Sequence, residues 1–561
     1  MRTSKLPATP VGEMAGKRAD RSSTPERVAA TGTGGGVASS AVRIWLACLG
    51  LLSIAAVPIL INQHPPLVDY PWHVARVVAL AQWRESPFVQ EHFQLSSLLV
   101  PNLGLEITVL PLLKVLPLAA AMDVFLIACF TLILGGTVAL HRVLHRSWSW
   151  WPLVAAVFLY NWILLYGFLG YVLGIGLFLC ATAAWLALRD HPWWLRLLVG
   201  SAFSIALFFV HMITLGLYAV AVAGYELQRA LVEPRRLEAK LAELAVGAGQ
   251  FVLPLILFMA ASPTRVVVGG SWVYKLFEKF ASPLATLTIG HFGMDVATLA
   301  GLGIAAAIVL RYGRIRIAGE FGLALGLLVL AFLALPHAMN WVGLVDVRVP
   351  AALLFAFIAA LRIEFRSLRA AWALAFVFAA IFIARVGISA VQWAQFDELS
   401  DAYRTALAAM KPESTLFLVK QSVPHSWARR IYVDRVLYPG HAALAVLEQP
   451  IFYTAGFIER GQQPIEVRER FGPLKDYQRD GGISVADEGE LRRVVDHVAE
   501  LQRGADPSES AYLLLVDRGV RPLDLPKDLG VVAAGPGFRL LEVYDPGDRL
   551  KDARSAQEAV P

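Results

Sequence analysis

Long apolar runs recur through most of this chain and constrain its fold more than any other feature. The first, about residues 43–62, is long enough to cross the roughly 30 Å hydrocarbon core of a bilayer as a helix. Further runs lie near residues 122–140, 150–165, 169–188, 195–210, 212–228, 245–262, 294–310, 320–336, 349–362 and 371–391. The chain is 57% hydrophobic and only 17% charged, which sets it apart from soluble domains. We therefore expect a polytopic α-helical membrane protein with about 11 spans.

Basic residues fall in alternate connections between these runs. They are Arg142 and Arg146; Arg189 and Arg196; Arg229, Arg235, Arg236 and Lys240; Arg311, Arg314 and Arg316; and Arg362, Arg366 and Arg369. These connections share a side with the basic N-terminal tail, residues 1–41, whose composition predicts disorder. Because Lys and Arg accumulate in cytoplasmic loops, the pattern places the N-terminus in the cytoplasm. It also accounts for the formal net charge of +6, so we expect no nucleic-acid partner.

The C-terminal region, residues 392–561, has a different texture. An odd number of spans places it on the outer face of the membrane. An amphipathic helical stretch, 396–410, is followed by short strand-like runs that Gly and Pro separate; these are 415–419, 451–453, 512–516 and 538–543. The pattern predicts a mixed α/β domain with a hairpin or loop at 530–537. Since it contains no phosphate-binding glycine loop and no nucleophile elbow, we expect a cap or an acceptor-binding domain.

Polar residues concentrate in the first outer loop, residues 63–121, directly after the first span. Asp69, His73 and Arg76 follow one another at spacings of four and three, so they share one face if the segment is helical. Ionisable groups are costly to keep at a membrane boundary, which favours a functional role.

Proline residues predict the local structure of this loop. They favour an extended entry and then a helix over about 72–83. Asp69 stands just before that helix, so a second interpretation stays open, in which it is only a helix cap. The apolar stretch 101–117 carries Glu106 and predicts a helix lying along the membrane surface.

Further candidates lie in later segments. His337, Asp346 and Arg348 occur in the outer loop near 336–350. Either Asp346 and Arg348 form a plain ion pair, or Arg348 provides the bidentate donor that a phosphate needs. His211 lies between two apolar runs, and we expect it to be an interhelical hydrogen bonder rather than a catalyst.

Three short motifs carry a resemblance to a known family. They are Asp69-Tyr70-Pro71-Trp72-His73-Val74-Ala75-Arg76, Pro101-Asn102-Leu103-Gly104-Leu105-Glu106 and Asp346-Val347-Arg348-Val349-Pro350. Together with the long first outer loop and the C-terminal outer domain, they resemble an uncharacterised bacterial subgroup of the C-type glycosyltransferase (GT-C) superfamily. Such enzymes move a sugar from a polyprenyl-phosphate donor to an acceptor outside the cytoplasmic membrane. Relatives often carry two adjacent acids in that loop, whereas Asp69 stands alone, and one carboxylate holds a divalent ion poorly. We name no metal ligand, and the cofactor stays unknown.

The resemblance implies roles for particular residues. Asp69 would be the base of an inverting transfer, and Glu106 would be a second acid. The substrate-binding candidates are His73, Arg76, Asn102, His337, Asp346 and Arg348, with Arg348, Arg76 and His337 facing the phosphate. The implied partners are a polyprenyl-phosphate-linked sugar, the lipid bilayer, and an acceptor glycan, lipid or protein.

The domain plan is then a cytoplasmic tail (1–41), a transmembrane unit (42–391) and an outer α/β domain (392–561), in a bacterial cytoplasmic membrane. Two other functions compete with glycosyl transfer. A non-catalytic envelope scaffold or lipid-binding protein would use Asp69 only as a cap. A transporter would show internal repeats and mid-membrane charges, whereas this sequence has few ionisable groups within its spans and no clear repeat.

Overall fold

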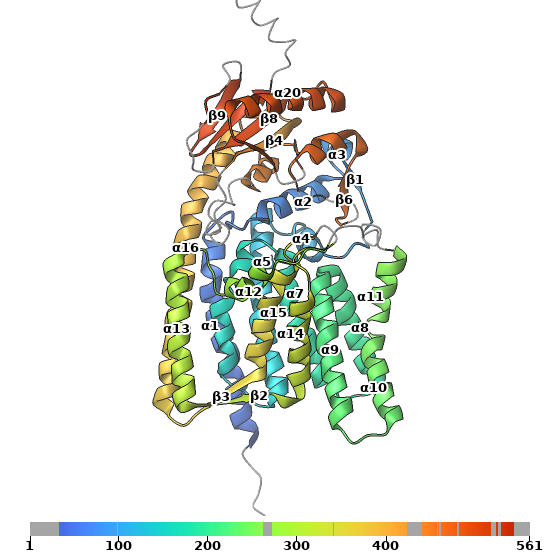
Figure 1. Cartoon of the computed structure of the whole chain (residues 1–561), viewed down its shortest axis with the longest axis vertical. Helices are drawn as coiled ribbons and strands as arrows, with labels where there is room; N and C mark the ends of the chain where they lie inside the picture. The colour runs from blue at the N-terminus through green and yellow to red at the C-terminus, as the bar shows by residue number, and fades with distance from the viewer. Residues whose placement is uncertain are drawn as a thin grey trace, which may run out of the picture.

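The computed structural model describes residues 33–97, 99–261, 272–339, 342–422, 440–456, 458, 462–478, 482–517, 523–525 and 529–543. Residues 1–32 of the tail predicted to be disordered lie outside these ranges. Residues 33–41 are instead helical and begin α1, so the predicted end of the tail at residue 41 is wrong. A tall body of helices carries a smaller domain with a sheet at one end (Figure 1).

The body is built from apolar helices. They are α1 (Thr33–Leu60), α5 (Leu118–His145), α7 (Leu169–Ala187), α8 (Trp193–Val210), α9 (Met212–Val232), α10 (Leu237–Gly249), α11 (Val252–Ile256), α13 (Phe292–Tyr312), α14 (Gly322–Ala334), α15 (Val345–Ala360) and α16 (Leu368–Leu407). Within the described ranges, six helices are long and apolar enough to cross a membrane, or up to seven if the bent pair at α10 and α11 is one span. The chain is therefore a multi-pass membrane protein, as predicted.

Each of the remaining predicted spans is either shorter than the roughly 20 residues that a bilayer requires or more polar than a typical membrane-spanning helix. The run at 150–165 is a 3-10 helix (Trp151–Phe158) followed by one helical turn, α6 (Trp162–Leu165). α14 has 13 residues and α15 has 16. The prediction of about 11 spans counted every apolar run as a span, although some of these runs form short helices within the body.

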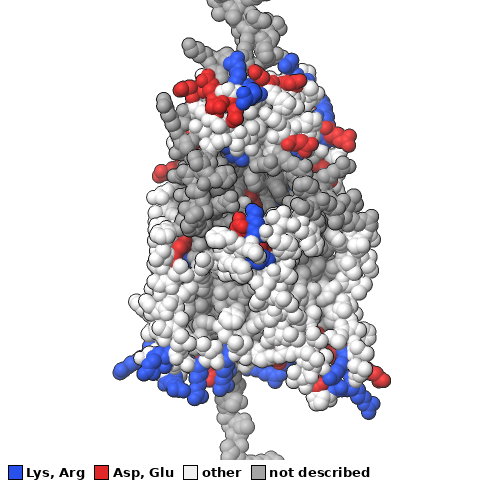
Figure 2. Space-filling view, in the orientation of Figure 1, with Lys and Arg blue, Asp and Glu red and all other residues white. Residues whose placement is uncertain are grey.

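Charge distinguishes the two ends of the body. Lys and Arg gather at the end away from the sheet (Figure 2). There β2 (Gly313–Ile317) and β3 (Leu361–Phe365) pair antiparallel and carry Arg314, Arg316 and Arg362. The positive-inside pattern predicts that this end faces the cytoplasm.

The C-terminal domain is mixed α/β, as predicted. Its sheet has the order β5 (Ile451–Tyr453), β4 (Ser414–Gln421), β8 (Ala511–Val516), β10 (Phe538–Val543) and β9 (Gly530–Gly535), with β7 (Ile483–Val485) also beside β4. β4 is parallel to β5, β7 and β8, whereas β10 is antiparallel to β8 and β9. α20 (Glu488–Ala505) packs its apolar face on this sheet. The strand-like runs of the sequence are strands. The segment 530–537, predicted as a hairpin or loop, is mostly strand β9, and only residues 536–537 form the turn of the hairpin to β10.

Two connections tie this domain to the body. α16 is a single helix of 40 residues, so the domain boundary predicted at 391/392 falls inside it. The long loop after α1 supplies α3 (Pro87–His92) and β1 (Phe93–Leu95), and β1 pairs antiparallel with β6 (Ile465–Val467). Part of this loop is thus built into the C-terminal domain, and α2 (Tyr70–Gln82) is held between that domain and the body (Figure 1).

Candidate active site

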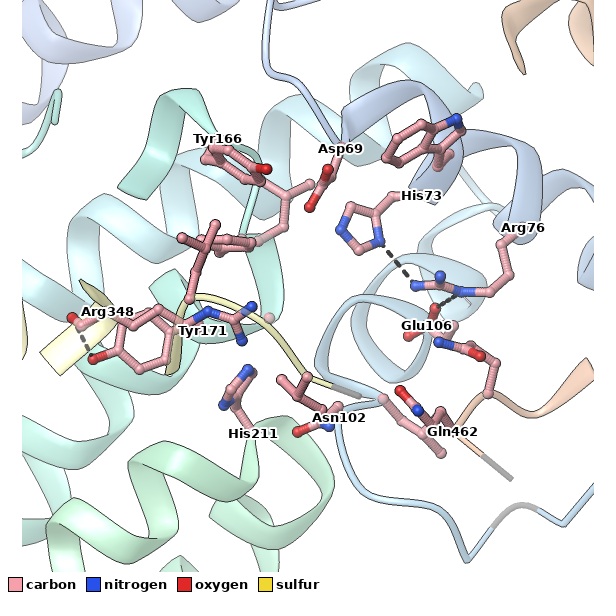
Figure 3. Close-up of a pocket in the computed structure, with 18 of the residues that line it drawn as sticks. Asp69, His73, Arg76, Asn102, Glu106, Tyr166, Tyr171, His211, Arg348 and Gln462 are labelled. Atoms are coloured by element: carbon pink, nitrogen blue, oxygen red, sulfur yellow. Dashed lines mark hydrogen bonds and ion pairs between the residues drawn. The ribbon is translucent and has the colours of Figure 1, made fainter. Parts of the chain in front are cut away.

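A cavity of about 320 Å³ lies between α2, α4 (Gly104–Leu112), the ends of several membrane helices nearest the sheet and one segment of the C-terminal domain. Its walls are formed by Asp69, Trp72, His73 and Arg76; Asn102, Leu103 and Glu106; Tyr166, Phe168, Leu169, Gly170 and Tyr171; His211; Val342, Gly343, Leu344 and Arg348; and Gln462, Gln463 and Pro464. Figure 3 shows charged and aromatic side chains directed at one another around the cavity.

Asp69 directly precedes α2, and its carboxylate points into the cavity (Figure 3). Its backbone has φ −88° and ψ −6°, and its side chain accepts no capping hydrogen bond, so the structure excludes the cap interpretation. Within the described part of the chain, the carboxylate has no hydrogen-bond or ion-pair partner. Burial raises the pKa of Asp69 to about 7, against the opposing effects of Arg348 and Arg76. A carboxyl group with this pKa is suited to take up a proton at neutral pH.

A tight turn at 165–167 fixes the backbone around Asp69. The amide of Val68 donates to the carbonyl of Leu165 at 2.9 Å, and the amide of Asp69 donates to the carbonyl of Tyr166 at 3.1 Å. Gly167 has φ +84°, which L side chains rarely adopt. A Cβ added to Gly167 would lie 2.6 Å from the amide nitrogen of Asp69. The glycine is therefore needed both for its own conformation and for the close approach of Asp69.

His73, Arg76 and Glu106 form a chain of hydrogen bonds along one wall. Arg76 Nε donates to Glu106 Oε1 at 2.5 Å, and Arg76 Nη2 donates to His73 Nδ1 at 2.8 Å. The proton of His73 therefore sits on Nε2, which donates to the carbonyl of Gly167 at 3.1 Å. Burial, followed by the charge of Arg76, lowers the pKa of His73 to about 3. Since both ring nitrogens are engaged, His73 holds the Gly167 turn rather than serving as a free base.

Arg348 reaches the cavity from the first turn of α15, across from Asp69 (Figure 3). Its Cζ lies 3.9 Å from the ring centroid of Phe168, and its Nη2 donates to the carbonyl of Gly343 at 3.2 Å. The hydroxyl of Tyr171 donates to the Arg348 carbonyl at 2.8 Å. Among the described residues no carboxylate pairs with Arg348, and its Nε is buried without a hydrogen-bond partner. Arg348 thus brings to the cavity a positive charge that no direct ion pair with a described residue neutralises.

Asn102 and His211 form the wall below Arg348. Asn102 has φ 68°, and its Oδ1 accepts a hydrogen bond from the amide of Met212 at 2.9 Å. His211 Nδ1 accepts one from the amide of Ile213 at 3.3 Å, so the imidazole caps α9. His211, expected to be an interhelical hydrogen bonder, is instead a helix cap that also lines the cavity.

The structure does not bring His337 and Asp346 to the cavity. Asp346 is fully buried, 3.1 Å from His337 Nδ1 and 3.6 Å from Lys279 Nζ. It therefore anchors the start of α15 and does not pair with Arg348. In the described ranges, no group of three or more His, Cys, Asp or Glu side chains is placed to hold a metal ion.

Several residues of the cavity have weak signals in the sequence. The aromatic residues Tyr166, Phe168 and Tyr171 surround Gly167 where two apolar runs meet, and this cluster at a span end is the one signal that marks them. Gln462 belongs to a short polar segment of the C-terminal domain without any motif. Only the three-dimensional fold places Gln462 near Arg76 and Glu106 (Figure 3).

Comparisons with known proteins give a distant likeness of fold. No protein-family model matches the chain, and no curated protein matches it in sequence. The crystal structure of ArnT from Cupriavidus metallidurans in the apo state has 13% identity and a TM-score of 0.48. The structure of the same protein bound to undecaprenyl phosphate has 10% identity and a TM-score of 0.47. Each likeness covers 91% of this chain and 98% of the other. No site residue is transferred at this level of similarity.

Proposed function

We propose that this protein is a membrane glycosyltransferase that moves a sugar from a polyprenyl-phosphate donor to an acceptor hydroxyl or amine. The observation that carries the proposal is that one cavity holds an acid and a cation, each without a direct ion-pair partner among the described residues. The unpartnered carboxylate of Asp69 and the guanidinium of Arg348 face it together, at the outer ends of the membrane helices. A base for the acceptor and a cation for a departing phosphate are the groups that such a transfer requires.

The reaction follows from their arrangement. Asp69 takes the proton of the acceptor as the acceptor oxygen or nitrogen forms a bond to the anomeric carbon. The bond from that carbon to the phosphate oxygen breaks, and its electron pair stays on the phosphate. Arg348 stabilises the negative charge left there. A direct displacement with one carboxylate inverts the configuration at the anomeric carbon and forms no covalent intermediate with the protein.

The remaining wall residues support this geometry. Arg76 is neutralised by Glu106, and the two residues are 5% and 3% exposed. We therefore assign Glu106 to positioning, through Arg76 and His73, instead of the role of a second acid. Asn102 holds its loop to the start of α9. The outer domain contributes Gln462, whose amide can both donate to and accept from sugar hydroxyls.

The location follows the same proposal. Basic connections at the far end of the body favour a cytoplasmic position for that end, in a bacterial cytoplasmic membrane. The cavity and the sheet domain then lie on the outer face, where the acceptor is met.

The test uses purified protein in lipid nanodiscs, supplied with polyprenyl-phosphate sugars and an envelope extract as the source of acceptors. Release of free polyprenyl phosphate is measured by mass spectrometry. Arg348→Ala should lower this release by about 10²–10³-fold, because a preorganised cationic group stabilises the departing charge. Arg311→Ala is the matched control, since Arg311 also lies over an aromatic ring, at 5.3 Å from Tyr312, but outside the cavity. If the wild-type protein neither releases nor binds polyprenyl phosphate, the proposed function is wrong.

The Gly167 turn offers a second test of the same site. Gly167→Ala should shift Asp69 and lower turnover by about tenfold to a hundredfold, because small misplacements of a reacting group have such effects. Gly537 is the matched control, since its φ is also positive (76°) but nothing lies within 4 Å of an added Cβ. Gly537→Ala should keep wild-type turnover, and thermal unfolding of both variants separates backbone strain from displacement of Asp69. Wild-type turnover in Gly167→Ala would show that this contact does not position the base.

A further inference from the structure

His211 occupies an unusual place, at the tip of a helical hairpin that has no loop. α8 ends at Val210 and α9 begins at Met212, so His211 alone reverses the chain. The residue is only 8% exposed, yet its ring lines the cavity and points toward the guanidinium of Arg348 (Figure 3).

The hydrogen bond to Ile213 assigns the tautomer of this imidazole. Nδ1 accepts from the amide of Ile213, so its lone pair is occupied and the proton of the neutral ring lies on Nε2. That N–H has no hydrogen-bond acceptor among the residues the structure describes. Tyr171 fixes the ring plane by an edge contact, with the centroids 5.1 Å apart. His211 therefore presents to the cavity a buried, oriented N–H donor without an acceptor in the part of the chain that the structure describes.

Two glycines allow the hairpin tip to come this close. A Cβ on Gly104 would lie 3.1 Å from the carbonyl oxygen of Val210, and one on Gly170 would lie 3.3 Å from the same atom. α4 and α7 thus pack tightly on the tip from both sides. The position of His211 is set by backbone packing rather than by a flexible loop, which favours preorganised binding.

We propose that His211 is a phosphate-binding residue, which donates its Nε2–H to one non-bridging oxygen of the lipid phosphate while Arg348 binds the other. The guanidinium of Arg348 is held by Phe168 and by the carbonyl of Gly343, so its remaining N–H groups face one side of the cavity. His211 covers the adjacent side (Figure 3). The positive end of α9, a helix of 21 residues, points the same way and adds to the attraction of an anion. This inference rests on the proposed function and deepens it.

The experiment separates helix capping from phosphate binding. His211→Ser keeps a favoured N-cap side chain but removes the imidazole N–H. We expect binding of polyprenyl phosphate to the nanodisc-embedded protein to weaken about tenfold to a hundredfold, as for loss of a charge-assisted hydrogen bond, while binding of polyprenol is unchanged. His211→Asn, whose side chain can cap with its oxygen and donate from its nitrogen, should restore part of the affinity.

His291 provides the matched control. It caps α13 in the same way, with Nδ1 accepting from the amide of Met294 at 3.1 Å, but it does not line the cavity. His291→Ser should therefore bind polyprenyl phosphate like the wild-type protein. Wild-type affinity in His211→Ser would overturn the inference, and continued turnover by the wild-type protein would leave the proposed function standing. If the wild-type protein shows neither binding nor turnover, both fall together.

Discussion

Asp69→Asn is expected to lower turnover by roughly 10²–10⁴-fold, the usual contribution of a general base, and to leave binding of polyprenyl phosphate near the wild-type level. The amide has the shape of the carboxylate but cannot accept the proton of the acceptor. Because Asp69 makes no side-chain cap and has no partner among the described residues, its replacement should leave the thermal stability almost unchanged. Release of polyprenyl phosphate and equilibrium binding, measured on the same preparation, separate the two effects.

The pH profile gives an independent reading of the same carboxylate. The pKa of Asp69 is raised to about 7, and the base must be ionised to act. We therefore expect kcat/KM to decrease as the pH is lowered through about 7 and to level off above it. Glu85→Gln is the control, since Glu85 is an exposed acid just past the end of α2. It should keep both the rate and the acidic limb. Turnover within tenfold of the wild-type value in Asp69→Asn would remove Asp69 from the role of the base.

Local patterns in the sequence predicted much of this site. The spacing of His73 and Arg76 placed them on one helix face, and the two side chains are in hydrogen-bond contact at 2.8 Å. The helix expected over 72–83 is α2, Tyr70–Gln82. These features depend on neighbours within one helix turn, which periodicity and proline positions report directly.

The contacts that bring distant segments together were beyond such patterns. Asp346 and Arg348 are two residues apart, yet one is buried against Lys279 and the other faces the cavity. Spacing alone could not separate an ion pair from this arrangement. The apolar surroundings of His211 predict an interhelical hydrogen bonder. The phosphate-binding role that we propose for it depends instead on the packing of the hairpin tip against α4 and α7. In the same way, β1 is only three residues long, and it is a strand because it pairs with β6, which lies hundreds of positions later in the sequence.

The second large effect concerns the buried ion pair of Arg76 and Glu106. Glu106→Ala should destabilise the protein by about 3–5 kcal/mol, because Arg76 would be left as a buried charge without a counterion. The two side chains are 5% and 4% exposed, with Nε and Oε1 at 2.5 Å. Loss of the pair also removes the contact that orients Arg76, whose Nη2 donates to His73, so we expect the support of the Gly167 turn and Asp69 to weaken. Thermal unfolding in nanodiscs and turnover should therefore decline together.

A second Arg–Glu pair in this chain shows what burial contributes. Arg470 and Glu91 lie 3.1 Å apart but are 46% and 48% exposed, so Glu91→Ala should change stability by less than about 1 kcal/mol. Glu106→Gln distinguishes positioning from acid catalysis, since the amide still accepts a hydrogen bond from Arg76 but cannot exchange a proton. Under the positioning role, its turnover should follow its stability and keep the wild-type acidic limb near pH 7. A stable Glu106→Gln variant with a hundredfold loss of turnover would instead return Glu106 to the role of a second acid.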